Sequence, residues 1–156
     1  MPAVAQTTEI NAPIKAVWDL MSDANRYAEW VTATDRMVSV PDGPMDVGYT
    51  YREYGGIPPF KSESEWRITE FKPYSRQVHV GDDGSMTMNL EIELTETASG
   101  TRLMQRISLK SRWWMRPMAM LMWPLLMRSR SQKVMRDTGA NAKRLLESAR
   151  GEAAAS

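Results

Sequence analysis

Residues 7–30 read TTEINAPIKAVWDLMSDANRYAEW, and their pattern predicts three elements in a fixed order. After a loosely alternating segment, Asn11 can cap a helix and Pro13 presets φ in its first turn. The apolar residues of 14–21 then recur at helical spacing and form one face. Asp23 is a candidate cap for a second, shorter helix that ends on an aromatic residue. We therefore expect a strand followed by two short helices.

Downstream of this stretch, strand patterns alternate with turn residues as far as residue 109. The clearest strand pattern is 86–94, in which apolar and polar residues alternate strictly. The expected strands are Val4–Ile10, Thr32–Val40, Tyr49–Tyr54, Lys61–Lys72, Arg76–Val80, Met86–Leu94 and Leu103–Leu109. Because helices are expected only after the first strand and after the last, the order favours an antiparallel α+β sheet over βαβ units.

The last third of the chain joins a segment rich in tryptophan and methionine to a long helix pattern. Residues 113–127 hold five methionines and three tryptophans, and Pro117 and Pro124 predict a broken helix there. The segment is too short and too often interrupted to span a membrane. A continuous helix is expected over Leu125–Ser148, and Gly139 within it indicates close packing against the sheet.

The order of these elements resembles the START/Bet v 1-like (SRPBCC) helix-grip superfamily, most closely its bacterial polyketide cyclase/dehydrase-like members. The resembling segments are Ile10–Pro13 with Val17–Trp18, Tyr27–Trp30, Val47–Gly48 and Leu145–Glu147. The resemblance implies a helix-grip fold: a curved seven-stranded antiparallel sheet wrapped around a long C-terminal helix, with an apolar cavity between them. The superfamily includes lipid and sterol carriers, quinone-binding proteins, aromatic polyketide cyclases and plant hormone receptors, so the fold does not specify the function.

Length and composition limit the possible classes of protein. The 156 residues suit one domain, expected over residues 1–150, followed by a disordered tail over 151–156. The chain has no cysteine and a single histidine, so we expect no metal site. No phosphate-binding loop follows Gly55–Gly56, and we expect no cofactor. The first residues do not resemble a signal peptide, which favours a cytoplasmic protein, with a peripheral position at the membrane as the alternative.

The net charge of +1 conceals an uneven distribution of charge. Residues 1–100 carry eight Lys or Arg and sixteen Asp or Glu (−8), residues 101–150 carry twelve and two (+10), and Glu152 restores +1. The asymmetry indicates contact with an anionic partner or neutralisation of the two segments within the fold. We expect no nucleic-acid partner, because the basic residues lie largely on a helix that must also bury one face. Either a monomer or a homodimer is compatible with the sequence.

The inventory of catalytic groups is small. Nucleophilic triads have no support, because cysteine is absent and His79, between two valines, is expected to face solvent. The weak catalytic candidates are Tyr51, Glu53 and Gln105, which alternation places on apolar inner faces. Burial would raise the pKa of Glu53 and suit it to acid–base work on a carbonyl compound. Alternatively, Glu53 pairs with an arginine at an open strand end, and Tyr51 and Gln105 satisfy each other in the core.

The candidate ligand-binding residues share the inner faces of the expected strands and helices. They are Trp30, Tyr49, Tyr51, Glu53, Trp66, Met88, Leu90, Gln105, Ile107, Met118, Met122, Val134 and Thr138. Methionine side chains are flexible and polarizable, so a wall rich in them can follow ligands of different shape.

Three functions remain open on the sequence alone. The first hypothesis is binding or carriage of a hydrophobic small molecule such as a lipid, an isoprenoid quinone or a polyketide. The second is a cyclase or dehydratase in which the three catalytic candidates orient a carbonyl substrate. The third is a membrane-associated interaction or regulatory protein in which Trp113, Trp114 and Trp123 insert at an interface while nearby arginines meet anionic headgroups.

Overall fold

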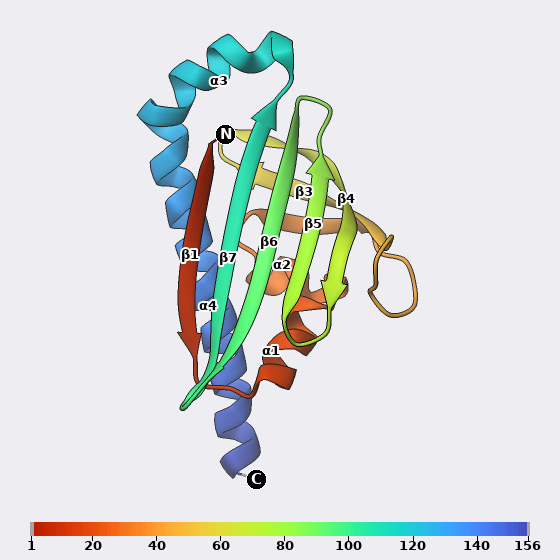
Figure 1. Cartoon of the computed structure of the whole chain (residues 1–156), viewed down its shortest axis with the longest axis vertical. Coiled ribbons are helices and arrows are strands. Elements are labelled where there is room, and N and C mark those ends of the chain that lie inside the picture. The colour runs from red at the N-terminus through yellow and green to blue at the C-terminus, as the bar shows by residue number, and fades with distance from the viewer. Residues whose placement is uncertain (1, 156) are drawn as a thin grey trace.

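The computed structural model describes residues 2–155, whose seven strands form one antiparallel sheet around a long C-terminal helix (Figure 1). The strands are β1 (Ala3–Ile10), β2 (Thr34–Ser39), β3 (Thr50–Ile57), β4 (Phe60–Lys72), β5 (Arg76–Asp82), β6 (Met86–Thr97) and β7 (Gly100–Ser111). Their order across the sheet is β1-β7-β6-β5-β4-β3-β2, so all sequence neighbours except β1 and β2 pair directly. This arrangement confirms the predicted antiparallel α+β architecture.

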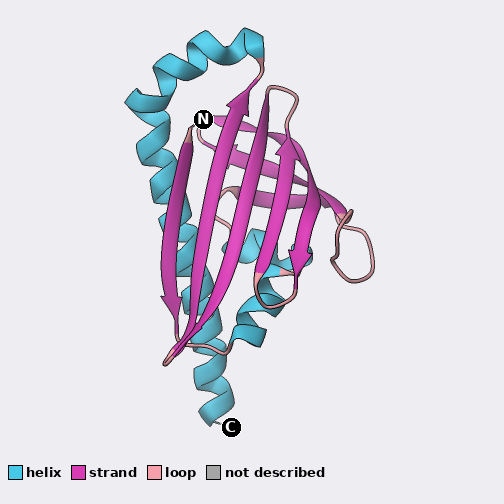
Figure 2. Cartoon of the chain, in the orientation of Figure 1, coloured by secondary structure: helices cyan, strands magenta, loops and turns pink. Residues whose placement is uncertain are grey.

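The helices follow the first and the last strand, as expected (Figure 2). They are α1 (Ile14–Met21), the 3₁₀ turn η1 (Ala24–Arg26), α2 (Tyr27–Trp30), the 3₁₀ turn η2 (Trp113–Met115), α3 (Arg116–Met122), the π-helical turn η3 (Trp123–Met127) and α4 (Arg128–Ala155). Asp23 caps η1 by accepting from the Asn25 amide. At α1 the prediction is corrected: Pro13 itself occupies the cap position, without a side-chain hydrogen bond, and Asn11 does not cap the helix.

The long helix differs from its predicted limits at both ends. It begins at Arg128, because the chain around Pro124 forms a π-helical turn that breaks the regular hydrogen bonding. It continues to Ala155, although residues 151–156 are predicted to be a disordered tail, and Ser156 lies outside the described residues. The alanine-rich end favours this extension because alanine has the highest helix propensity.

Strand β3 also extends further than predicted, through Gly55 and Gly56, which the sequence indicates as a break. Gly55 pairs with Ser62 of β4 and Thr34 of β2. A Cβ atom at Gly55 would lie 1.9 Å from the Ala33 carbonyl oxygen. Glycine is therefore required here because the neighbouring backbone approaches closely.

Helix α4 packs along the inner face of the sheet, beside β1. Gly139 permits this contact, because a Cβ atom there would lie 2.3 Å from the Thr8 hydroxyl oxygen. This confirms the close packing predicted from the glycine. Helices α1 and α2 cover the lower end of the same face in Figure 1, and the tightest core, including Ile10, Leu20 and Leu103, lies there.

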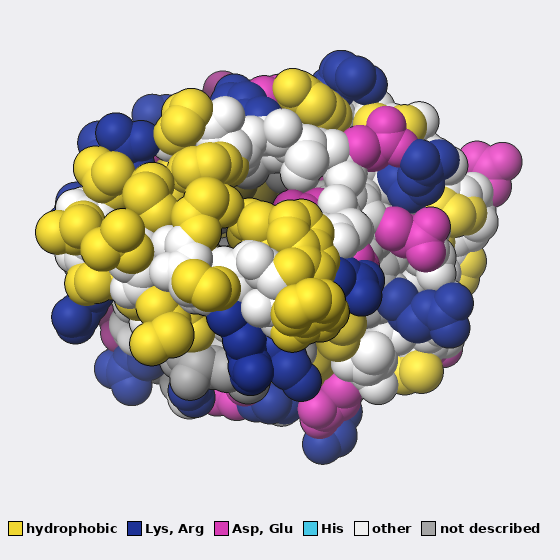
Figure 3. Space-filling view, turned by 90° about the horizontal axis from the view of Figure 1, so that it is seen from above, with side chains coloured by type: hydrophobic (Ala, Val, Ile, Leu, Met, Phe, Trp, Pro, Cys, Tyr) yellow, Lys and Arg dark blue, Asp and Glu magenta, His cyan; other side chains and the backbone are white. Residues whose placement is uncertain are grey.

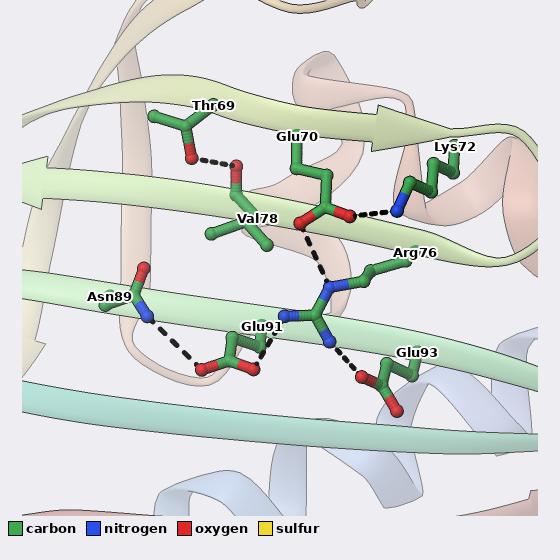
Figure 4. A network of polar contacts seen from close by, with 8 residues as sticks. All are labelled: Thr69, Glu70, Lys72, Arg76, Val78, Asn89, Glu91 and Glu93. Atoms are coloured by element: carbon green, nitrogen blue, oxygen red, sulfur yellow. Dashed lines mark hydrogen bonds and ion pairs between the residues drawn. The ribbon is translucent and has the colours of Figure 1, made fainter.

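The outer face of the sheet carries a charged network centred on Arg76 (Figure 4). Its guanidinium contacts Glu70 at 3.2 Å, Glu91 at 2.9 Å and also Glu93. These partners raise the pKa of Arg76, the hydrogen bond to Glu70 foremost, and hydrogen bonds from Lys72 and Arg76 lower the pKa of Glu70. The network links β4, β5 and β6 across the solvent face of the sheet.

Candidate functional site

A cavity of about 390 Å³ lies between the inner face of the sheet and helix α4. Strands β3 to β7, helix α2 and helix α4 form its walls, and α3 with the η3 turn covers the end away from α1. At this end the chain passes from α3 through the η3 turn into α4, and α3 arches over the end of the sheet (Figure 1). The wall is largely apolar, with a few polar side chains at fixed positions.

The structure brings together nearly all the predicted ligand-binding residues. The cavity wall contains Trp30, Tyr51, Glu53, Trp66, Met88, Leu90, Gln105, Ile107, Met118, Met122, Val134 and Thr138. Tyr49 is the exception: it precedes β3, and its hydroxyl donates to the Pro41 carbonyl at 2.8 Å. Contact of these residues with a ligand stays a prediction.

His79 corrects the expectation of a solvent-facing side chain, because it is only 1% exposed and lines the cavity. Its Nδ1 lies 3.0 Å from the Tyr51 hydroxyl, and its Nε2 lies 3.0 Å from Gln77 Oε1. Gln77 Nε2 in turn donates to Ser22 Oγ at 2.6 Å. The inner face of β5 is thus polar. The alternation rule placed these side chains on the outer face, but they can be buried because they form hydrogen bonds with one another.

This chain of hydrogen bonds defines the protonation of its members. Burial lowers the pKa of His79 to about 3, so the ring is neutral near pH 7. Because Gln77 Oε1 can only accept, Nε2 carries the proton and Nδ1 accepts from Tyr51. Burial also raises the pKa of Tyr51 well above its usual value. Tyr51 therefore presents a neutral hydroxyl whose remaining capacity toward the cavity is to accept a hydrogen bond. Its partner is His79, which replaces the expected pairing with Gln105.

Glu53 lies on the same strand as Tyr51 and faces the cavity. Burial raises its pKa, and the hydrogen bond from Thr34 Oγ1, at 2.7 Å, partly opposes that shift. The side chain of Trp66 lowers this pKa as well, so Glu53 interacts with a hydroxyl and an indole where the sequence left an arginine open as its partner. The group is a carboxyl in a largely apolar wall.

Aromatic rings form one continuous side of the cavity. Tyr51 and Trp66 are stacked, with ring centroids 6.4 Å apart and an interplanar angle of 8°. Tyr27 meets Tyr51 edge to face, with centroids 5.4 Å apart. Such contacts hold the rings in fixed orientations, so this side of the cavity is rigid.

Sequence reasoning missed Ser131, which is 2% exposed and lines the cavity from α4. The helical spacing could have identified Ser131, because residues 127, 131, 134 and 138 lie on one helix face. All four residues line the cavity. Thr34 and Tyr27 were also missed; both lie in short elements near the α2–β2 connection, where periodicity is weak.

The end of the molecule around α3 exposes an apolar surface (Figure 3). Trp113 is 81% exposed, Trp114 54% and Met120 78%, while Leu121 and Leu125 are also exposed. Lysine and arginine side chains border this surface in the same view. Trp123, grouped with the other two tryptophans in the sequence, is half-buried and lines the cavity instead.

Within residues 2–155, no cluster of three or more His, Cys, Asp or Glu side chains could hold a metal ion. A second, open depression on the outside of α4 is lined by residues such as Lys143 and Glu147, which pair with each other. It offers no enclosure for an apolar molecule.

Among the helices described in residues 2–155, none combines the length and the hydropathy needed to cross a membrane.

Solved structures of low sequence identity share this fold. The aromatase/cyclase ZhuI from Streptomyces sp. R1128 is 16% identical, with a TM-score of 0.71 over 92% of this chain and 94% of that one. The di-domain aromatase/cyclase BexL of the BE-7585A biosynthetic pathway is 17% identical, with a TM-score of 0.73 over 94% of this chain and 50% of that one. A protein from Chromobacterium violaceum is 15% identical, with a TM-score of 0.67 over 94% and 99%. At such identities the likeness confirms the helix-grip fold and no more.

No curated protein matches the chain in sequence. The model of one protein family does match, and it covers residues 1–147. That family is described as polyketide cyclase / dehydrase and lipid transport. With nearly the whole chain matched and the helix-grip fold in place, this protein belongs to the polyketide cyclase/dehydrase and lipid transport family.

Proposed function

We propose that this protein binds a hydrophobic small molecule, such as a lipid, an isoprenoid quinone or a polyketide-like compound, and carries it in the cavity. The observation that supports the proposal most strongly is the space of about 390 Å³ walled mainly by apolar side chains. Protein interiors normally pack as densely as organic crystals, so an unfilled apolar space of this size indicates a ligand site. The methionines of the wall suit a ligand whose outline they can follow.

The proposal is tested on protein purified from a lipid-rich expression strain. Native mass spectrometry followed by solvent extraction should find one apolar molecule per chain. Ile107→Trp should retain less of the molecule than wild type, because Ile107 lines the cavity and the larger ring takes up part of its space. Val47→Trp, the matched enlargement at an exposed loop residue, should retain the molecule. If wild type is empty and takes up no added hydrophobic compound, the proposal is wrong.

The apolar surface around α3 supports a peripheral contact of this carrier with a membrane. Exposed tryptophans at the end of a cavity can enter the headgroup region, where aromatic rings are favoured. Arg112 and Arg130 are held within the fold, by Asp82 and by the Pro58 carbonyl. Arg116 is exposed beside the tryptophans, where an anionic headgroup would be a suitable partner.

Co-sedimentation with vesicles tests this contact. Vesicles of phosphatidylglycerol should bind the protein more tightly than vesicles of phosphatidylcholine, and added salt should weaken the binding. The double change Trp113→Ser and Trp114→Ser should weaken it about tenfold, because two exposed rings no longer enter the interface. Val47→Ser serves as control. Equal binding of the double variant and the control would exclude this surface as the contact.

A second candidate function is catalysis of the cyclase or dehydratase kind, favoured by one observation, a carboxyl with raised pKa in the cavity wall. Glu53 could move a proton to or from the carbon next to a ligand carbonyl. The test is exchange of the methyl protons of acetonaphthone for deuterium, followed by NMR. Acceleration by wild type but not by Glu53→Gln would support catalysis, whereas equal rates with and without protein would exclude this step.

A further inference from the structure

We infer that the ligand of this cavity is an uncharged oxygenated compound, in which an otherwise apolar body carries a hydroxyl or carbonyl oxygen. The inference rests on the proposed function, because it specifies the chemistry of the molecule that the cavity takes. Two independent observations carry it: unpartnered polar atoms in the wall, and the charges around them.

Three buried side-chain polar atoms in residues 2–155 lack a hydrogen-bond partner: Trp30 Nε1, Gln105 Oε1 and Ser131 Oγ. All three residues line this one cavity, and each is at most 3% exposed. They come from α2, β7 and α4, on different sides of the space. Because buried polar groups are nearly always paired, three orphans around a single cavity indicate that its occupant supplies the partners.

The three atoms together define a hydrogen-bonding pattern. The Trp30 indole N–H can only donate, so it requires an acceptor oxygen. The Gln105 oxygen accepts, which requires a hydroxyl or another donor, and the Ser131 hydroxyl can do either. A hydroxyl group satisfies both kinds of partner, whereas a carbonyl satisfies the donors. A pure hydrocarbon would leave all three unpaired.

The charges of the wall argue against an anionic headgroup. Glu53 and Asp83 are the acidic residues of the wall, and Lys61 is its one lysine or arginine. Lys61 is already engaged by Asp35, with both carboxylate oxygens within 2.9 Å. His79 is neutral because burial lowers its pKa to about 3. Among residues 2–155, a carboxylate or phosphate inside the cavity would thus meet negative charge without an available cation of the wall, which is costly in an apolar surrounding.

The experiment compares three probes with the same ring system, namely naphthol, naphthalene and naphthoate, by fluorescence or NMR titration at pH 7. Wild type should bind naphthol roughly tenfold more tightly than naphthalene, the effect of pairing one or two buried polar atoms. Naphthoate should bind more weakly than naphthol, because the part of the wall formed by residues 2–155 offers no free cation.

Variants of the three residues connect the selectivity to the orphan atoms. Trp30→Phe removes the indole N–H, Gln105→Met the side-chain amide and Ser131→Ala the hydroxyl, and each should lower the naphthol-to-naphthalene ratio by about threefold or more. Ser108→Ala is the matched control, because Ser108 is buried on the same strand as Gln105 but does not line the cavity. If Trp30→Phe fails to fold, the smaller change Ser131→Ala tests whether the orphan atoms cause the selectivity for naphthol.

The outcomes separate this inference from the proposed function. Equal affinity of wild type for naphthol and naphthalene, or tightest binding of naphthoate, would overturn the inference and leave a carrier of another ligand class. A ratio that all three variants leave unchanged would overturn it too, because the orphan atoms would then be satisfied by water. Failure of every probe to bind would overturn the proposed function together with the inference.

Discussion

At the scale of single residues, the wall of the cavity contains a buried histidine that stays neutral near pH 7. The unfolded chain binds a proton at His79 below its ordinary pKa of 6.5, whereas the folded protein does so only near pH 3. Since the unfolded state binds more protons between these values, the stability falls as the pH falls through this window. The free energy of unfolding should drop by about 2 kcal/mol between pH 7 and pH 5 from this group alone.

Urea denaturation at the two pH values measures this effect, with His79→Gln as the comparison. The variant keeps a hydrogen-bonding side chain beside Tyr51 but has no group that titrates in this window. Its loss of stability between pH 7 and pH 5 should be smaller by the same ~2 kcal/mol. Identical pH dependence of the two proteins would mean that the histidine is not buried in its neutral form.

The direction of individual side chains could be predicted from the sequence at some positions of the cavity wall but not at others. Alternation identified Tyr51, Glu53 and Gln105 as inward-facing, because their strand neighbours on the same face are apolar. It placed His79 outward, because the rule assumes that polar residues face water. In the structure His79 and Gln77 form part of a closed hydrogen-bond chain, and such partners from distant segments cannot be read from one strand.

At the scale of elements, the contact of α4 with β1 depends on a missing side chain. Gly139→Ala should raise helix propensity by ~1 kcal/mol. It should nevertheless destabilise the protein by about 1–2 kcal/mol, because the new methyl group would lie 2.3 Å from Thr8 Oγ1. In a Thr8→Ala background the same change should become stabilising.

Urea denaturation of the single and double variants checks this prediction. Gly151→Ala is the control in the same helix, because nothing lies within 4 Å of a Cβ atom there. It should stabilise the protein by at most ~1 kcal/mol. If Gly139→Ala stabilises the wild-type background as well, the close approach of α4 to β1 is wrong.

The outer network joins three strands through one guanidinium. Arg76→Met should destabilise the protein by about 1 kcal/mol at low salt, because three carboxylates are then left close together. The loss should shrink as salt is added, since screening weakens the repulsion. Arg67→Met, at an exposed position of β4, is the comparison. A salt-independent loss in denaturation experiments would assign the effect to packing rather than to charge.

At the scale of the whole molecule, the order of elements could be predicted from the sequence, but the shape of the cavity could not. The regular alternation in 86–94 predicted a strand, and the two prolines of 113–127 predicted a broken helix. Both patterns depend on local sequence alone. The wall of the cavity combines residues from β3 to β7 with residues of α2, α3 and α4, and its three unpartnered polar atoms come from α2, β7 and α4. Those juxtapositions arise only when distant segments meet.

The uneven charge of the chain is partly neutralised in the same way. Arg102 of the basic last third pairs with Glu9, and Arg112 pairs with Asp82. These contacts support neutralisation within the fold as one of the two readings of the charge pattern. Arg116 and Trp113 are both exposed, so contact of this segment with an anionic partner stays a proposal.

One measurement tests the internal binding site most directly: an NMR titration of protein labelled at its thirteen methionine methyl groups with naphthol. Met88, Met122 and Met135 line the cavity, whereas Met37 and Met45 do not. If the cavity binds the ligand, ring-current shifts appear at the first group, saturate at one molecule per chain and spare the second. Absence of saturable shifts at the lining methionines, or shifts confined to the exposed Met120, would contradict the account.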